Sequence, residues 1–240
     1  MKKKYMQKWQ FEISGKTVTV YPSKTPDCPI VYLNTFGDEG EKVYLLLQQN
    51  QCPDFTFVTV GGLAWDRDMA PWDIPPVSKF DTPCTGGASE YLKLLAGEIV
   101  PKAEETATGK IIWRGLAGYS LGGLFAVYAL YHTGAFSRIA SVSGSLWYPG
   151  LMDYVRKQEP KVRPNHIYFS LGSKESYTRN PILKTVQENT ETLKRLYEKA
   201  GIDTVFDLNP GGHYRNAAGR TAAGISWILS RSSTSMEEIK

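Results

Sequence analysis

Cysteine and histidine are both scarce in this sequence, which holds three of each among its 240 residues. Cys28, Cys52 and Cys84 are odd in number and follow neither a C-x-x-C nor a zinc-type spacing. These cysteines therefore indicate neither a disulfide framework nor a metal site. A reducing, cytoplasmic compartment is the expected location.

The sequence also lacks long apolar runs and a strong charge imbalance. No stretch approaches the ~18 to 20 apolar residues of a membrane-spanning helix, and no apolar segment of signal-peptide length follows the basic start. The net charge is +4, but the Lys2–Lys4 run supplies most of it, and no basic stripe with interleaved aromatics occurs elsewhere. We therefore expect neither a membrane nor a nucleic acid as partner.

Internal repeats and low-complexity segments are absent as well. The composition, with 42% hydrophobic, 12% aromatic and 22% charged residues, is that of a globular protein able to bury a sizeable core. We predict a single α/β domain that spans residues 1–240.

Strand-like and helix-like segments alternate through most of the chain. Residues 9–13 and 17–21 flank a polar Ser-Gly-Lys turn, which predicts an antiparallel hairpin at one edge of a sheet. Apolar runs predict further strands at residues 29–33, 54–60, 110–117, 138–142, 166–171 and 204–208. Helices are expected at residues 41–49, 89–99, 124–131, 182–200 and 217–229, with Pro101 marking the end of the second. The predicted fold is a mostly parallel central sheet with an N-terminal antiparallel hairpin and helices on both faces.

The segment Gly118-Tyr119-Ser120-Leu121-Gly122 matches the pattern G-x-S-x-G between an apolar strand and a helix-like run. Glycines two residues either side of the serine permit a strained turn that projects its hydroxyl outward. This context predicts the nucleophile elbow of an α/β-hydrolase fold, with Ser120 as nucleophile. An ordinary Gly-Ser turn is the alternative interpretation.

A serine hydroxyl needs a positioned base before it attacks a carbonyl group, so this interpretation requires a histidine. His213 follows an apolar strand and two glycines near the C-terminus, where the chain order Ser, acid, His puts the base. His132, in the last turn of a helix, and His166, at the start of a strand, have structural explanations. We therefore predict His213 as the general base.

The third member of such a triad is a carboxylate that accepts the imidazole proton. Glu175 comes just after the strand at residues 166–171, between Ser120 and His213 in the chain. We predict Glu175 in this role, with Asp207 and Asp203 as the alternatives.

Two backbone donors are expected to form an oxyanion hole. Leu121 follows the nucleophile and supplies the first N–H. Phe36, in the turn after the strand at residues 29–33, is predicted to supply the second, and Gly61-Gly62 is a less favoured source.

Aromatic residues gather in loops that the predicted topology brings to the same edge of the sheet. Trp65, Trp147 and Tyr148 are predicted to contact the substrate, and Arg67 is a candidate for holding a substrate carboxylate, with Arg179 as the alternative. For the aromatics, packing beneath the long loop at residues 64–85 is the alternative.

Five segments follow one another along the chain: Tyr32-Leu33, Gly118–Gly123, Ser143–Ser145, Gly172–Glu175 and Gly211–His213. In these segments and their order, the sequence resembles the esterase family that includes enterobactin esterase-like and S-formylglutathione hydrolase-like (esterase D) enzymes. The resemblance extends from about residue 29 to residue 229. The resemblance implies a Ser–His–acid carboxylic ester hydrolase that acts on a small-molecule ester without a metal or organic cofactor. One departure is Asn34–Gly37, which stands where a His-Gly pair is usual.

The leading hypothesis is a serine esterase that works through an acyl-enzyme, with the aromatic loops favouring aryl or siderophore-type esters. An acyltransferase that uses the same triad is one alternative. A catalytically silent hydrolase fold that serves as a binding module is the other. Oligomeric state is not indicated by the sequence.

Overall fold

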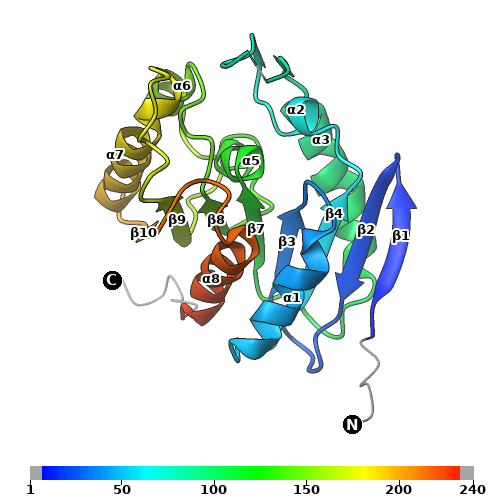
Figure 1. Ribbon diagram of the computed structural model, residues 1–240. Helices are drawn as coiled ribbons and strands as arrows, with labels where there is room; N and C mark the ends of the chain where they lie inside the picture. The colour runs from blue at the N-terminus through cyan, green and yellow to red at the C-terminus, as the bar shows by residue number, and fades with distance from the viewer. Residues whose placement is uncertain (1–6, 80, 233–240) are drawn as a thin grey trace.

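An eight-stranded sheet in the order β1-β2-β4-β3-β7-β8-β9-β10 runs through the molecule (Figure 1). The computed structural model describes residues 7–79 and 81–232, so the lysine run at residues 2–4 lies outside the described residues. The hairpin β1 (Trp9–Ile13) and β2 (Lys16–Tyr21) is antiparallel and pairs with β4 at one edge. The other strands run parallel: β3 (Ile30–Asn34), β4 (Thr56–Gly61), β7 (Arg114–Tyr119), β8 (Arg138–Val142), β9 (His166–Gly172) and β10 (Asp203–Asn209). The predicted mostly parallel sheet with an N-terminal hairpin is confirmed.

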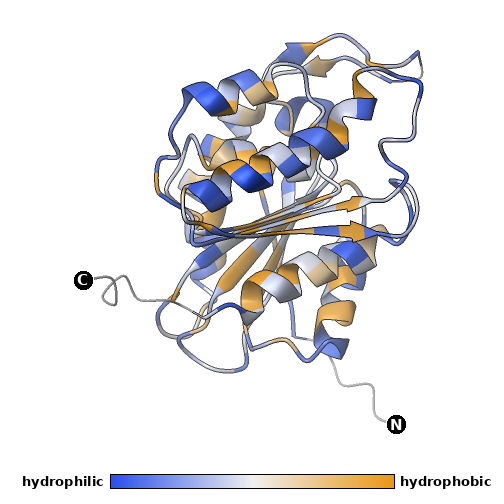
Figure 2. Cartoon of the chain, turned by 90° about the vertical axis from the view of Figure 1, so that its left-hand side faces the viewer, coloured by the Kyte–Doolittle hydropathy of each residue, from blue (hydrophilic) through white to orange (hydrophobic). Residues whose placement is uncertain are grey.

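Helices cover both faces of the sheet, which Figure 2 shows nearly edge-on. One face carries α1 (Glu39–Gln49) and α8 (Ala217–Ser230), which pack on each other and on the central strands. The other carries α3 (Ala88–Leu94), α5 (Leu121–Ala129), α6 (Leu151–Lys157) and α7 (Val186–Lys199). Each face has its own apolar core, as expected for strands that are buried on both sides. The helix α6 was not among the expected elements.

Pro101 does not end the helix that precedes it, contrary to the sequence-based expectation. α3 continues through a π-helical turn, η1 (Leu95–Ile99), into α4 (Val100–Glu104), which has Pro101 in its first turn. The Val100 N–H bonds to the Leu95 carbonyl, five residues back. Because a π turn widens the helix, the proline ring and its missing N–H are accommodated where a regular α-helix would break.

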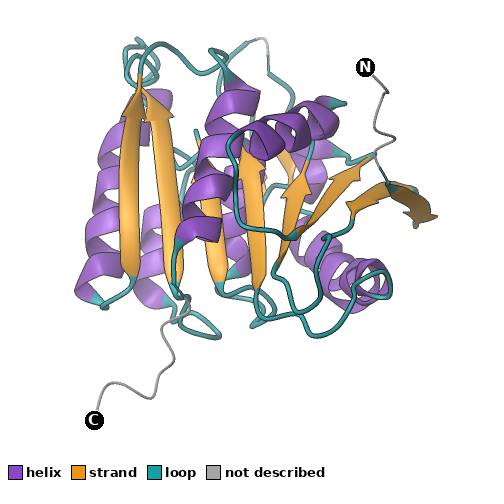
Figure 3. Cartoon of the chain, turned by 90° about the horizontal axis from the view of Figure 1, so that it is seen from below, coloured by secondary structure: helices purple, strands orange, loops and turns teal. Residues whose placement is uncertain are grey.

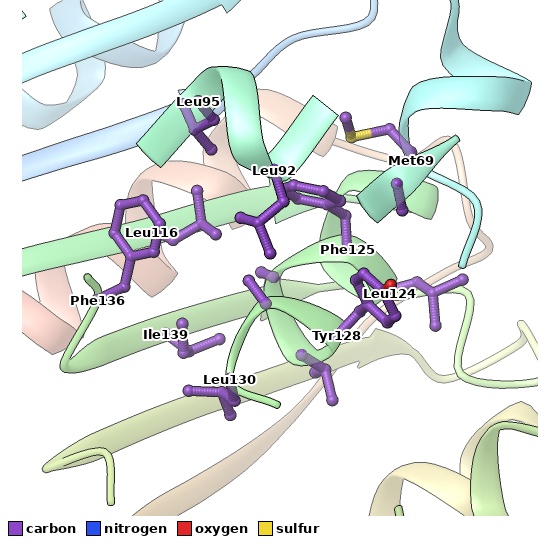
Figure 4. Close-up of a cluster of buried hydrophobic side chains, with 14 of the residues drawn as sticks. Met69, Leu92, Leu95, Leu116, Leu124, Phe125, Tyr128, Leu130, Phe136 and Ile139 are labelled. Atoms are coloured by element: carbon purple, nitrogen blue, oxygen red, sulfur yellow. The ribbon is translucent and has the colours of Figure 1, made fainter. Parts of the chain in front are cut away.

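The core anchors the helix that begins at the candidate nucleophile. Every residue of α5 is buried, and Leu124 and Phe125 lie among side chains from α3 and the strands (Figure 4). Full burial of each Leu or Phe side chain contributes roughly 1.5–3 kcal/mol. The N-terminus of α5 is therefore held rigidly above the sheet.

Parallel strands bring the turns that follow them to one edge of the sheet. Figure 3 shows the strands side by side, and β7, β8 and β9 are neighbours in the half of the sheet away from the β1–β2 hairpin. Above this edge lies the segment at residues 64–85, with α2 (Trp65–Asp68) and a small hairpin of β5 (Asp73–Ile74) and β6 (Cys84–Thr85).

Among residues 7–79 and 81–232, none of the helices has the length and apolar character that crossing a membrane requires.

Candidate active site

Ser120 occupies a sharp turn between β7 and α5. Its φ of 57° and ψ of −122° are strained for a residue with a side chain. The turn is held because the Ser120 N–H donates to the Val142 carbonyl at 3.1 Å and the Ser120 carbonyl accepts from two amides of α5. A Cβ on Gly118 would lie 2.2 Å from the Gly122 carbonyl carbon, so the approach of strand and helix requires glycine. The predicted strand–turn–helix arrangement is present.

The structure brings Ser120, His213 and Glu175 into one hydrogen-bonded chain. Ser120 Oγ lies 3.0 Å from His213 Nε2, and His213 Nδ1 lies 2.7 Å from Glu175 Oε2. An ionised carboxylate only accepts hydrogen bonds, so Nδ1 carries the imidazole proton and Nε2 is the acceptor. In this tautomer His213 is oriented to take the proton of Ser120.

The Glu175 carboxylate is buried, with its side chain 5% exposed, and is surrounded by donors. Oε2 bonds His213, and Oε1 accepts from the Gly172 N–H at 2.5 Å, from Ser143 Oγ at 2.8 Å and from Arg220 Nη1 at 3.1 Å. Burial by itself would raise the pKa of Glu175. The hydrogen bond and the electrostatic interaction with His213, together with the hydrogen bonds from the Gly172 N–H and the Ser143 hydroxyl, outweigh the effect of burial and hold this pKa below its ordinary value. Glu175 is therefore a carboxylate under neutral conditions.

Two side chains that had no predicted role fix the loop of the histidine. Arg220 Nη2 donates to the Gly212 carbonyl at 2.8 Å, and the Tyr119 hydroxyl donates to the His213 carbonyl. Arg220 is 3% exposed and also bonds Ser143 Oγ at 2.9 Å. A sequence signal for Arg220 existed, since it is the one charged residue in the helical segment Ala217–Ser230.

The alternative acids and bases lie elsewhere. Asp203 Oδ2 is 2.9 Å from Nδ1 of His166, and Asp207 is exposed on β10. His132 Nε2 pairs with the Tyr154 hydroxyl at 2.8 Å. His166 begins β9, as expected, but His132 lies beyond α5, which ends at Ala129, and so is not in the last turn of that helix.

The two predicted oxyanion donors differ in their availability. Leu121 is the first residue of α5, where backbone N–H groups have no partner within the helix. The Phe36 N–H donates to Glu39 Oε1 at 2.8 Å, and the Gly37 N–H donates to the other carboxylate oxygen of Glu39 at 2.8 Å. Phe36 can therefore serve an oxyanion only if it exchanges this partner.

A cavity of about 550 Å³ opens over the Ser120 hydroxyl. Apolar side chains supply slightly more than half of its walls, and the rest includes acidic side chains. The lining consists of Phe36, Trp65, Asp66, Ile74, Pro75, Val77, Asp81, Thr82, Cys84, Ser120, Leu121, Ser145, Trp147, Glu175, Leu183, Val186, His213 and Tyr214. Lysine and arginine are absent from this lining among the residues that the structure describes.

Two of the four predicted substrate residues, Trp65 and Trp147, line this cavity, and the other two do not. The guanidinium of Arg67 pairs with Asp68 at 3.2 Å and with Glu90, which directs it away from the cavity. Tyr148 is 2% exposed, and its hydroxyl donates to the Trp72 carbonyl at 2.5 Å. Tyr148 therefore packs beneath the loop, as the alternative interpretation of the aromatics had it.

The parallel sheet, the strained serine turn and the Ser–His–carboxylate chain together define the α/β-hydrolase class of serine hydrolases. Residues 19–218 match the model of the Esterase family, described as "Putative esterase". The chain therefore belongs to this esterase family, and the protein is a serine esterase. It is also 25% identical over 204 residues to the Bacillus subtilis (strain 168) protein YbbA. The match covers 80% of this chain and 82% of YbbA.

Solved structures share the fold at low sequence identity. The siderophore hydrolase EstA from Aspergillus nidulans is 18% identical, with a TM-score of 0.72 and coverage of 93% of each chain. The enterobactin hydrolase IroE in complex with DFP is 21% identical, with a TM-score of 0.70, and the match covers 94% of this chain and 95% of IroE. At this identity, both similarities concern the fold.

Proposed function

We propose that this protein hydrolyses carboxylic esters through an acyl-enzyme on Ser120, with His213 as general base and Glu175 as the acid that orients it. The observation that carries the proposal is the chain of two hydrogen bonds, 3.0 Å and 2.7 Å long, that links the three side chains at the cavity. The buried, multiply bonded carboxylate supports the role of Glu175, because it can stabilise an imidazolium without taking its proton.

In the proposed reaction, Ser120 supplies the nucleophile and His213 carries the proton at each step. His213 Nε2 accepts the Ser120 proton as Oγ bonds to the ester carbonyl carbon, which forms a tetrahedral oxyanion. The intermediate collapses, the C–O bond to the alcohol breaks, and the imidazolium returns the proton to the leaving oxygen. A water molecule then repeats the sequence on the acyl-enzyme, and the carboxylic acid leaves.

The proposed oxyanion donors are the N–H groups of Leu121 and Phe36. Their positions, after the nucleophile and after β3, are those that such donors occupy in this fold. For Phe36 the role requires that the oxyanion displaces Glu39 Oε1, which accepts this N–H at 2.8 Å. Removal of one such donor typically costs about 10²–10³ in kcat.

The cavity favours an ester with a bulky, uncharged group. Its volume of about 550 Å³ is within the range of sites for drug-sized ligands, and Trp65 and Trp147 offer faces for an aromatic ring. Since Asp66 and Asp81 lie in its walls, a carboxylate on the substrate would be repelled. We therefore propose neutral aryl esters as substrates, and siderophore-type esters are the variant suggested by the names of EstA and IroE.

The test is turnover of aryl esters by purified wild type, Ser120→Ala and His213→Gln proteins, with the released alcohol and acid both quantified. We expect turnover by wild type alone and equal amounts of the two products. Absence of turnover across a series of neutral aryl esters would contradict the proposal. Acylated alcohol in excess of free acid, in the presence of an acceptor, would identify an acyltransferase instead.

A further inference from the structure

Ser145 lies beside the nucleophile, and none of the steps above uses it. It follows β8, lines the cavity and is 2% exposed. Its Oγ is 3.3 Å from Ser120 Oγ, and its backbone N–H donates to the Ser120 carbonyl at 3.0 Å. The two serines are therefore joined through both side chain and backbone.

The direction of the hydrogen bond between the two hydroxyls follows from the protons available. With Nδ1 of His213 protonated toward Glu175, Nε2 is an acceptor, so the Ser120 hydroxyl donates its proton to it. A hydroxyl has one proton to donate, so Ser120 Oγ acts toward Ser145 as an acceptor. The Ser145 hydroxyl is then the donor of this bond.

The turn that carries Ser145 is fixed by backbone contacts. Ser143 has a φ of 44°, a strained value for a residue other than glycine, and its N–H donates to the Ser170 carbonyl at 2.8 Å. The Ser145 carbonyl accepts from the Tyr148 N–H at 3.1 Å. In one short turn, Ser143 thus donates to Glu175 and Ser145 contacts Ser120. Strained residues of this kind cluster at functional sites.

We propose that Ser145 is a positioning residue that donates a hydrogen bond to Ser120 Oγ and prepares it for attack. This inference rests on the proposed function, because it takes Ser120 as the nucleophile. The bond holds the Ser120 hydroxyl in the orientation that points at His213, and it stabilises the negative charge that develops on Oγ as the proton leaves. No covalent bond of Ser145 is made or broken in the reaction.

The test compares Ser145→Ala and Ser145→Cys with the control Ser141→Ala. Ser141 is also a buried serine near the end of β8, but its hydroxyl has no hydrogen-bond partner in the described part of the chain. We expect Ser145→Ala to lower kcat on an aryl ester by about two- to tenfold with KM unchanged, as for loss of one hydrogen bond between neutral groups. Ser145→Cys, which keeps a weak donor, should lie between Ser145→Ala and wild type, and Ser141→Ala should match wild type.

A second readout isolates the attack step. The rate at which a fluorophosphonate labels Ser120 should fall by the same factor in Ser145→Ala, because labelling needs an activated Oγ but no deacylation. Thermal unfolding of each variant identifies any that is misfolded, and Ser145→Cys carries the test if Ser145→Ala does not fold.

Unchanged kcat and labelling in folded Ser145 variants of an active enzyme would overturn this inference and leave the proposed function intact. An increase in KM with an unchanged labelling rate would overturn it as well, because it would indicate a substrate contact. An inactive wild-type enzyme that fails to label would contradict the proposed function itself.

Discussion

Replacement of Glu175 by glutamine should abolish most of the activity by inverting the tautomer of His213. Three donors, from Gly172, Ser143 and Arg220, converge on Oε1, and one, from His213, approaches Oε2. A glutamine of the same shape will therefore turn its carbonyl oxygen toward the three donors and its amide NH2 toward His213. The imidazole ring then has to accept a hydrogen bond at Nδ1 and carry its own proton on Nε2. Because Nε2 faces the Ser120 hydroxyl, a protonated Nε2 cannot take the proton of Ser120.

The expected loss in kcat is about 10⁴-fold, the size seen when the acid of a serine protease triad becomes an amide and the tautomer is wrong. This corresponds to about 5 kcal/mol of transition-state stabilisation. KM should change little, because the interaction acts in the transition state. The variant also leaves the buried Arg220 without its counter-charge, so the free energy of unfolding should fall by about 3 kcal/mol.

The assay is steady-state hydrolysis of a neutral aryl ester, with urea unfolding followed by circular dichroism on the same preparations. Asp207→Asn is the matched control, because Asp207 is exposed and was an alternative for the same role. Glu175→Gln with more than a tenth of the wild-type kcat would refute the reasoning. An equal loss in Asp207→Asn would do so too.

Two further predictions concern charge and pH. An aryl ester with a carboxylate on its acyl group should show a kcat/KM at least about tenfold below that of its uncharged analogue, and Asp66→Asn should reduce this difference; equal rates for the two esters would contradict the acidic character of the cavity. Because the pKa of Glu175 is lower in the folded protein than its ordinary value of 4.5, the unfolded chain takes up this proton first as the pH falls. The stability that Glu175 contributes should thus be complete above pH 4.5 and disappear as the pH falls through the folded pKa, and the loss should be smaller in Glu175→Gln when unfolding is measured in this range.

The sequence predicted those parts of the fold that have a strong local signal. Apolar runs bounded by turns located the strands, and the run at residues 138–142 coincides with β8. Ser120 followed from the G-x-S-x-G motif between a strand and a helix, and His213 and Glu175 followed from the chain order Ser, acid, His and from their positions after strands. Their assembly needed no knowledge of side-chain conformation. That residues 1–240 form one domain stays a prediction.

Sequence reasoning failed where the outcome depends on the direction of a side chain or on a distant partner. In α2, Asp66 faces the cavity and its neighbour Arg67 faces Glu90, a difference that composition cannot reveal. After β8, Trp147 lines the cavity and Tyr148 is buried beside it. Adjacent residues in a helix or turn point to different sides, so a motif identifies the segment but not the contact.

The continuation of the helix past Pro101 has the same kind of cause. The sequence shows the missing N–H, but the π-helical turn that accommodates it depends on how η1 packs, with Leu95 and Ile99 fully buried. The helix breaker was identified correctly and its effect was not. Tertiary packing overrode the local preference.

The most direct measurement of the central claim is labelling with a fluorophosphonate, read by intact mass and by peptide mapping of wild type, Ser120→Ala and Glu175→Gln. Labelling requires both a nucleophilic serine and the base that activates it, and it is independent of the natural substrate. We expect one label on Ser120 in wild type, none in Ser120→Ala and a strongly slowed reaction in Glu175→Gln. Folded wild-type protein that remains unlabelled, or a label on another serine, would contradict the account.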